Sequence, residues 1–492
     1  IAMSIQNNLR PFRRGLLLAV MTAAPLVAAA APTSGLIDAN FDRSVRPQDD
    51  FFRYVNGTWL KDTPIPADKS SYGITQVQED RNLEWLKAIV EKSAAQKAAT
   101  GTEAQQIGDL YASYMDETKL NALGVTPVQP LLAKVDAIKA RGELTALFAE
   151  LERLAVPTPI SSYVQPDARD ATRYALYLSQ AGLGLPDRDF YFEKGERFEK
   201  MRAAYLAFAT QLFTLAGDAR PAEQAQRVMA FETTLAKSQW TKVQNRDPVK
   251  TYNLRKVNVL MQQAPGFDWA GWLKGVGVKA DTVVVNQPSY LKAFAQLVAK
   301  TDLETLKAYT RLRVLSDFAP YLSQPFFDVH FAFKGRALRG IEAPKPRWKR
   351  GIDVVENAIG ESLGKVFVAE HFSDDSKRRV EAMAQNVITA YGQEIDTLDW
   401  MSAATKQKAH EKLAKFTVKV GYPKVWRDYS SIAIKSDDLV GNVQRATAFE
   451  LQRNLNKLGK PIDRTEWDMT PQTINAYYNP LQNEIVLPAA IL

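Results

Sequence analysis

The sequence predicts a mainly α-helical protein, on three observations. Apolar residues recur three or four positions apart, the spacing of one helix face, through most of the chain from Phe51 onward. Stretches in which apolar and polar residues alternate, as in strands, are few and short. The chain has 492 residues, with 46% hydrophobic and 24% charged residues. This composition is typical of a globular protein, and the length is too great for one hydrophobic core.

The first thirty residues are typical of a secretory signal. A region rich in arginine is followed by an apolar run and then by alanines. We expect cleavage after Ala30, which makes residues 1–30 a signal peptide and residues 31–45 an exposed leader. The apolar run is too short for a stable membrane span, and no later stretch is apolar enough for one. The sequence therefore predicts a periplasmic or secreted protein with no membrane span after signal cleavage.

Helical periodicity is clear in a series of stretches that begins soon after the leader. They are residues 82–99, 102–120, 143–154, 198–216, 222–239, 303–318, 353–372, 376–398 and 402–414. We also expect Asp49 and Asp50 to cap a first helix near Phe51, because carboxylates interact favourably with the free N–H groups at a helix start.

Strands are predicted in four short stretches. They are residues 173–179, 415–420, 474–478 and 483–487. The last two flank Asn479 and Pro480, which favours a hairpin. The prediction is therefore a helical body with a strand pair at the end of the sequence.

The composition excludes several classes of function. The chain has no cysteine, so it forms no disulfide, thiolate nucleophile or cysteine-ligated zinc site. Its net charge is +8, and removal of Arg10, Arg13 and Arg14 with the signal leaves 8 − 3 = +5. These charges are scattered, which argues against a nucleic-acid partner. We interpret the basic run of residues 345–350 as a solvent-exposed face.

The three histidines do not form a metal site by their spacing. A zinc peptidase helix with the pattern H-E-x-x-H has its second histidine four residues after the first. His410 is followed by Glu411, but Ala414 occupies the second position. We therefore interpret His410, His371 and His330 as structural, and we expect no metal ligand and no catalytic residue in this chain.

Several motifs follow one another in an order that resembles a known family. They are Asp49-Asp-Phe-Phe-Arg-Tyr-Val-Asn-Gly-Thr-Trp59, Gln180-Ala-Gly-Leu-Gly-Leu-Pro-Asp-Arg-Asp-Phe-Tyr191, Gly360-Glu-Ser-Leu-Gly364 and Asn475-Ala-Tyr-Tyr-Asn-Pro480. In this order they resemble the neprilysin-like (M13) family of zinc metalloendopeptidases, in its bacterial secreted or periplasmic branch.

The resemblance implies a domain organisation. It implies a helical domain over residues 46–423, a connecting segment over residues 424–470, and the first strands of a thermolysin-like α/β zinc peptidase domain over residues 471–492. It also implies a zinc ion as cofactor, held by residues that follow Leu492 in the family. We expect that the sequence stops before these ligands and that this chain alone is inactive.

The resemblance further implies that Asn475 and Ala476 bind substrate along a strand edge, where an extended peptide can pair with the main chain. The parent protein is expected to cleave short peptides on the amino side of hydrophobic residues. Ser71 stands where some animal members have an arginine for a terminal carboxylate, which favours endopeptidase action. The alternative is a non-catalytic periplasmic peptide-binding or scaffold protein.

Overall fold

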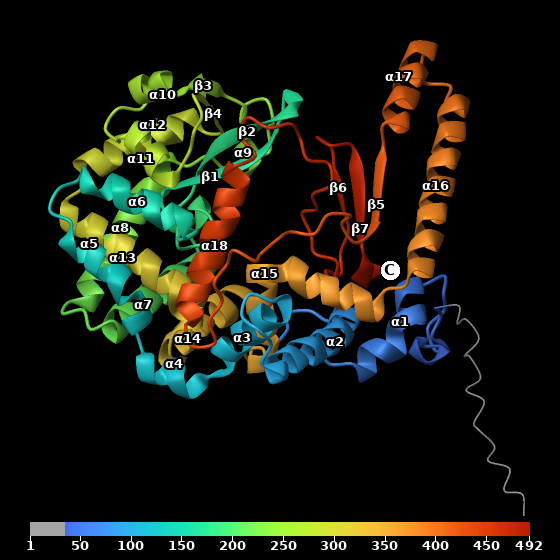
Figure 1. The fold of residues 1–492 in the computed structure, drawn as a ribbon, viewed down its shortest axis with the longest axis horizontal. Coiled ribbons are helices and arrows are strands. Elements are labelled where there is room, and N and C mark those ends of the chain that lie inside the picture. The colour runs from blue at the N-terminus through green and yellow to red at the C-terminus, as the bar shows by residue number, and fades with distance from the viewer. Residues whose placement is uncertain (1–34) are drawn as a thin grey trace, which may run out of the picture. The chain divides into compact units, whose positions relative to one another are not determined.

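The computed structural model describes residues 35–492, so the signal expected at residues 1–30 lies outside the described residues. The described chain forms two units, a smaller one that ends at Pro64 and a larger one, Ile65–Leu492. The smaller unit contains a 3-10 turn (Asp38–Asn40) and the helix α1 (Phe51–Asp62) (Figure 1). Asp50 caps α1 as predicted, since its carboxylate accepts a hydrogen bond from the Arg53 N–H. Asp49 instead pairs with Arg46.

The larger unit is mainly helical, as predicted (Figure 1). The helices that match the predicted stretches are α2 (Ile74–Gln96), α3 (Glu103–Met115), α4 (Glu117–Leu123), α6 (Glu143–Arg153), α7 (Glu196–Leu215), α8 (Pro221–Ser238), α13 (Leu303–Phe318), α15 (Arg347–His371), α16 (Asp374–Thr397) and α17 (Ala403–Ala414). Most boundaries agree within a few residues because capping side chains such as Ser373 and Ser402 mark the helix starts.

Periodicity did not predict the remaining helices. They are α5 (Gln129–Ala137), α9 (Lys242–Asn245), α10 (Val257–Gln263), α11 (Trp269–Val276), α12 (Pro288–Lys300), α14 (Gln324–His330) and α18 (Leu439–Leu455). A π-helix over Phe331–Ala337 follows α14. Helix α18 lies within the segment 424–470, which the sequence suggested only as a connection.

The larger unit has two small sheets. One contains β1 (Ile160–Asp167), β2 (Asp170–Gln180), β4 (Thr282–Val285) and β3 (Leu254–Lys256), in that order across the sheet. The other has the order β5 (Thr417–Gly421), β7 (Glu484–Pro488) and β6 (Tyr477–Asn479). Strands β6 and β7 are antiparallel, which confirms the predicted hairpin, and β5 runs parallel to β7. Strand β6 is therefore an edge strand.

Two hydrophobic cores stabilise the larger unit. The first lies among α5 to α14 and the four-stranded sheet, and the second lies among α2, α3 and α15. Helix α18 contributes to both, with Val440 and Leu455 in the first core and Leu439 and Ala446 in the second. Helix α18 therefore packs against both cores and connects them.

Helix α16 carries an exposed apolar stripe. Met383, Val387 and Tyr391 are spaced four residues apart, which places them on one face, and their exposed fractions are 57%, 51% and 62%. No residue of α16 is buried in the described part of the chain. Among residues 35–492, no helix combines the length and the apolar character that crossing a membrane requires.

A fully buried carboxylate organises the first core. Glu232 accepts hydrogen bonds from the Tyr191 hydroxyl (2.6 Å), the Tyr205 hydroxyl (2.9 Å) and the Gly184 N–H (3.1 Å). It also forms an ion pair with Arg313, which is itself buried. The side chain thereby connects α8 to α7, to α13 and to the glycine-rich segment that follows β2.

We expect Glu232→Gln to lower the free energy of unfolding by about 3 kcal/mol, because it leaves the Arg313 charge buried without a counterion. Urea denaturation measures this change. The control is Glu223→Gln, which breaks a partly exposed pair with Arg227 and should cost less than about 1 kcal/mol. Equal losses in the two variants would contradict the assignment of Glu232 as a structural centre.

Candidate functional site

Asn475 and Ala476, the residues expected to bind substrate, lie directly before β6. Asn475 is exposed and Ala476 is half-buried. Within residues 35–492, no strand pairs with the outer edge of β6. Alternate residues of an edge strand direct their N–H and C=O groups away from the neighbouring strand. The segment therefore has main-chain groups available for an extended peptide.

The Asn475 side chain currently bonds to its own neighbour. Its Oδ1 accepts a hydrogen bond from the Ala476 N–H at 2.8 Å. A peptide carbonyl that binds the Ala476 N–H must therefore displace the Asn475 side chain. An amide side chain can both donate and accept, so the displaced group remains able to bind the peptide main chain.

The hairpin that carries this edge is fixed at two points. The Tyr477 hydroxyl accepts a hydrogen bond from the Asp468 N–H at 2.8 Å, and burial raises the pKa of Tyr477. Asn479 Oδ1 accepts from the N–H groups of Leu481 (3.1 Å) and Gln482 (3.3 Å), which closes the turn. The edge is thus built on an ordered hairpin.

A half-buried carboxyl contacts the segment that leads to Asn475. Glu356 of α15 accepts a hydrogen bond from the Thr470 hydroxyl at 3.2 Å. Burial raises the pKa of Glu356 from its ordinary value of 4.5 to about 7, although the Thr470 bond opposes the change. The protonated and the ionised carboxyl are therefore both populated near neutral pH.

The three histidines lie on separate helices. His330 ends α14, and burial lowers its pKa to about 4. His371 stacks on Trp85 with ring centres 4.6 Å apart, and His410 Nε2 lies 2.8 Å from Asp396 Oδ1. In the described part of the chain, no three histidine, aspartate or glutamate side chains gather closely enough to hold a metal. The described residues therefore do not fit a zinc site.

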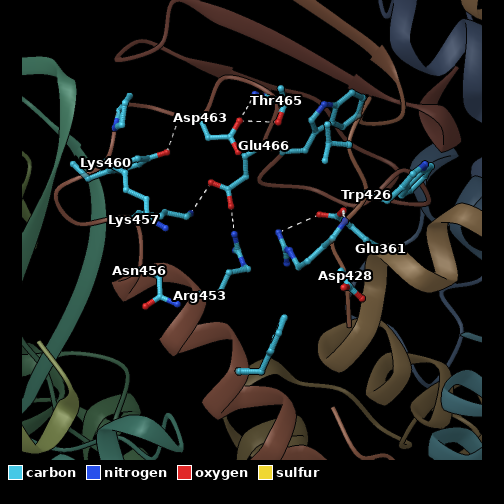
Figure 2. A pocket seen from close by; sticks show the side chains of 16 residues that line it. Glu361, Trp426, Asp428, Arg453, Asn456, Lys457, Lys460, Asp463, Thr465 and Glu466 are labelled. Atoms are coloured by element: carbon cyan, nitrogen blue, oxygen red, sulfur yellow. Dashed lines mark hydrogen bonds and ion pairs between the residues drawn. The ribbon is translucent and has the colours of Figure 1, made fainter. Parts of the chain in front are cut away.

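A cavity of about 430 Å³ lies beside α18 and the segment that follows it (Figure 2). Tyr174 of β2, Glu361 of α15, and residues 425–428 and 456–467 contribute to its wall. Several of its charged side chains pair with one another, whereas Asp428 and Lys460 are exposed. We define the α18 charge cluster as the lining residues Glu361, Arg427, Arg453, Lys457 and Glu466 together with the neighbouring Glu450.

Charges within the α18 charge cluster are paired. Arg427 lies 3.1 Å from Glu361 and 2.9 Å from Glu450, and Lys457 lies 2.6 Å from Glu466. Arg453 also pairs with Glu466, as Figure 2 shows. Burial alone would raise the pKa of Glu466, but the two cations lower it. The charges of three carboxylates and three cations sum to zero, so the cluster has no net charge that would attract a charged ligand. Its ion pairs connect α18 to the neighbouring segments that contain Glu361, Arg427 and Glu466.

The basic run at residues 345–350 is not a solvent-exposed face, so that interpretation is wrong for residues 347–350. Arg347 donates to the Tyr114 carbonyl (2.6 Å) and Arg350 to the Tyr114 hydroxyl (3.0 Å), while Lys349 pairs with Asp80 (2.9 Å). These cations are half-buried because Tyr114 and Asp80 lie on neighbouring helices. Periodicity alone does not reveal such partners.

The chain matches known peptidases over most of its length. Residues 47–423 match the model of peptidase family M13. The endothelin-converting enzyme homolog of Locusta migratoria and endothelin-converting enzyme 1 of Rattus norvegicus are each 30% identical, over 95% and 94% of this chain. The zinc metalloprotease Zmp1 of Mycobacterium tuberculosis, solved in complex with an inhibitor, is 43% identical over 94% of this chain, with a TM-score of 0.89.

These relatives are longer than the chain. It spans 67% of the locust protein, 63% of the rat enzyme and 70% of the Zmp1 chain. The similarity therefore covers nearly all of this chain but about two thirds of each relative.

The raised pKa of the half-buried Glu356 carboxyl can be tested. Because its pKa is raised, protonation stabilises the fold at low pH, and this contribution is lost as the pH rises from about 4.5 through about 7. Glu356→Gln stays neutral throughout. We therefore expect the melting temperature of the unsubstituted protein, relative to that of the variant, to fall between about pH 5 and about pH 8. Exposed Glu84→Gln is the control, and a constant difference for Glu356→Gln would contradict this assignment.

Proposed function

Because this chain belongs to peptidase family M13, we propose that its parent protein is a zinc-dependent endopeptidase that cleaves short peptides on the amino side of hydrophobic residues. The observation that carries the proposal is the outer edge of β6 beside Asn475 and Ala476, with which no strand of residues 35–492 pairs, in a chain that matches zinc metalloproteases along nearly its full length. A peptide lying along this edge forms one more strand of the sheet.

The chain's own residues bind and orient the substrate in this proposal. Ala476 offers main-chain groups to the peptide, and the Asn475 amide donates to a peptide carbonyl or accepts from a peptide N–H. Binding the backbone in this way fixes the direction of the peptide without selecting its side chains. Side-chain selection, including the preference for a hydrophobic residue, is then made elsewhere in the protein.

The zinc ligands belong, in our proposal, to the third of the relatives' length that this chain does not span. The described residues do not fit a metal site, so the chain alone is proposed to be inactive. When bound, zinc polarises the scissile carbonyl and activates water. The exposed stripe of α16 supports further protein at this surface, since apolar residues spaced along one helix face are usually covered.

A periplasmic or secreted location is part of the same proposal. It is supported by the sequence of residues 1–30, with their basic region, apolar run and terminal alanines.

We expect Asn475→Ala in the complete protein to raise KM for a fluorogenic peptide with a single leucine by about tenfold, because the side-chain bond to the peptide main chain is lost. Steady-state kinetics measure this effect. The control is Asn258→Ala, an exposed asparagine on α10, which should leave KM unchanged. If KM and kcat of Asn475→Ala both equal the unsubstituted values, Asn475 does not bind substrate.

We further expect the complete protein to contain about one zinc ion per chain, and residues 1–492 alone to contain almost none. Metal analysis by mass spectrometry measures both. A chelator should abolish hydrolysis by the complete protein, and added zinc should restore it. A complete protein that binds peptides without zinc and without cleaving them would support the non-catalytic peptide-binding alternative. Stoichiometric zinc in residues 1–492 would overturn the placement of the ligands.

A further inference from the structure

We infer that one face of α15 positions the peptide-binding edge, and that it acts through residues 470–473. Gly360 and Gly364 form this face, and Gln472 is the positioning residue that rests on it. The inference rests on the proposed function, in which Asn475 and Ala476 hold the substrate. Gln472 lies three residues before Asn475 and is 2% exposed, so it acts on the substrate only through the chain that follows it.

The two glycines allow the segment to approach the helix closely. They are four residues apart and therefore lie on the same side of α15. A Cβ atom at Gly364 would lie 2.5 Å from Gln472 Oε1 and 2.8 Å from Pro471 Cδ. A Cβ atom at Gly360 would lie 2.8 Å from Thr470 Cγ2. No other residue type fits at either position without moving residues 470–472.

Hydrogen bonds then hold the segment against this face. The backbone of α15 is non-helical at Ile359, with φ −139° and ψ 42°. The adjacent Gly360 carbonyl accepts a hydrogen bond from Gln472 Nε2 at 2.9 Å. A break in the helix thus coincides with the point where the helix binds the segment.

Two further elements fix the same residues. Asn82 Nδ2 of α2 donates to the Gln472 carbonyl at 2.8 Å, and the Ala490 N–H donates to the Pro471 carbonyl at 2.9 Å. Residues 471 and 472 are therefore held by α2, by α15 and by the residues that follow β7. Pro471 and Gln472 are buried, and a displacement of the segment would break several of these hydrogen bonds.

Two tight turns connect residues 470–472 to Asn475. The Thr473 N–H donates to the Thr470 carbonyl, and the Asn475 N–H donates to the Thr473 carbonyl, each at 3.0 Å. The Thr470 and Thr473 hydroxyls also lie 2.8 Å apart. The connection from Gln472 to Asn475 spans three residues and is closed by these turns, so we expect a shift at Gln472 to move the edge.

The test is Gly364→Ala in the complete protein, assayed with the same single-leucine fluorogenic peptide. The added methyl group displaces Gln472 and Pro471, so we expect KM to rise roughly tenfold while kcat changes less than about twofold. The matched control is Gly351→Ala on the same helix. Its Cβ atom would lie 2.8 Å from Tyr111 Cε2 in the second core, so it should lower the melting temperature without changing KM.

A second variant covers the case in which Gly364→Ala fails to fold. Gln472→Ala removes the bond to Gly360 and creates space instead of a clash, so the protein should fold, and KM should rise roughly fivefold. If KM is unchanged in Gln472→Ala, or if Gly351→Ala raises KM as much as Gly364→Ala, the inference is overturned.

A double-mutant cycle with Asn475→Ala separates this inference from the proposed function. If α15 acts through the edge, Gly364→Ala should raise KM much less in the Asn475→Ala background than in the unsubstituted protein. An equal rise in both backgrounds would show that the glycine acts elsewhere and would reject the inference alone. If Asn475→Ala by itself has no effect, the proposed substrate-binding role fails instead.

Discussion

The packing of α18 into both hydrophobic cores is the constraint on which the larger unit depends. Val440 and Leu455 contribute to the core around the four-stranded sheet, and Leu439 and Ala446 contribute to the core of α2, α3 and α15. The α18 charge cluster continues this connection on the polar side, since Arg427 pairs with Glu450 and Lys457 pairs with Glu466 across neighbouring segments. Neither core could shift independently without exposing apolar surface or separating these charges.

Periodicity predicted the long amphipathic helices well because their buried faces follow the helical repeat directly. Helix α18 was missed because Gly441 and the buried Asn442 interrupt its apolar pattern near the start. Asn442 is buried because its amide exchanges two hydrogen bonds with the backbone of Lys435, a partner that no local pattern reveals. Strands β3 and β4 were missed because three or four residues are too few to display alternation.

The candidate site was predictable only in part, and for a similar reason. The substrate-binding role of Asn475 and Ala476 was inferred from the resemblance to a family, since one exposed asparagine before a short strand has no distinctive sequence signal of its own. Gly360 and Gly364 were visible as part of a motif, but their partner Gln472 lies more than a hundred residues away. The close approach of two distant segments is a property of the folded chain. Sequence could have suggested it only through the spacing of the two glycines.

The open edge of β6 has a consequence for self-association. An edge that accepts an extended peptide also accepts the same edge of another molecule, which is the first step of fibril-like aggregation. Here the strand has only three residues, the turn begins at Pro480, and Asn475 Oδ1 accepts a hydrogen bond from the Ala476 N–H. The side chain thus occupies a main-chain donor beside the edge, and the short strand leaves little length for two copies to pair.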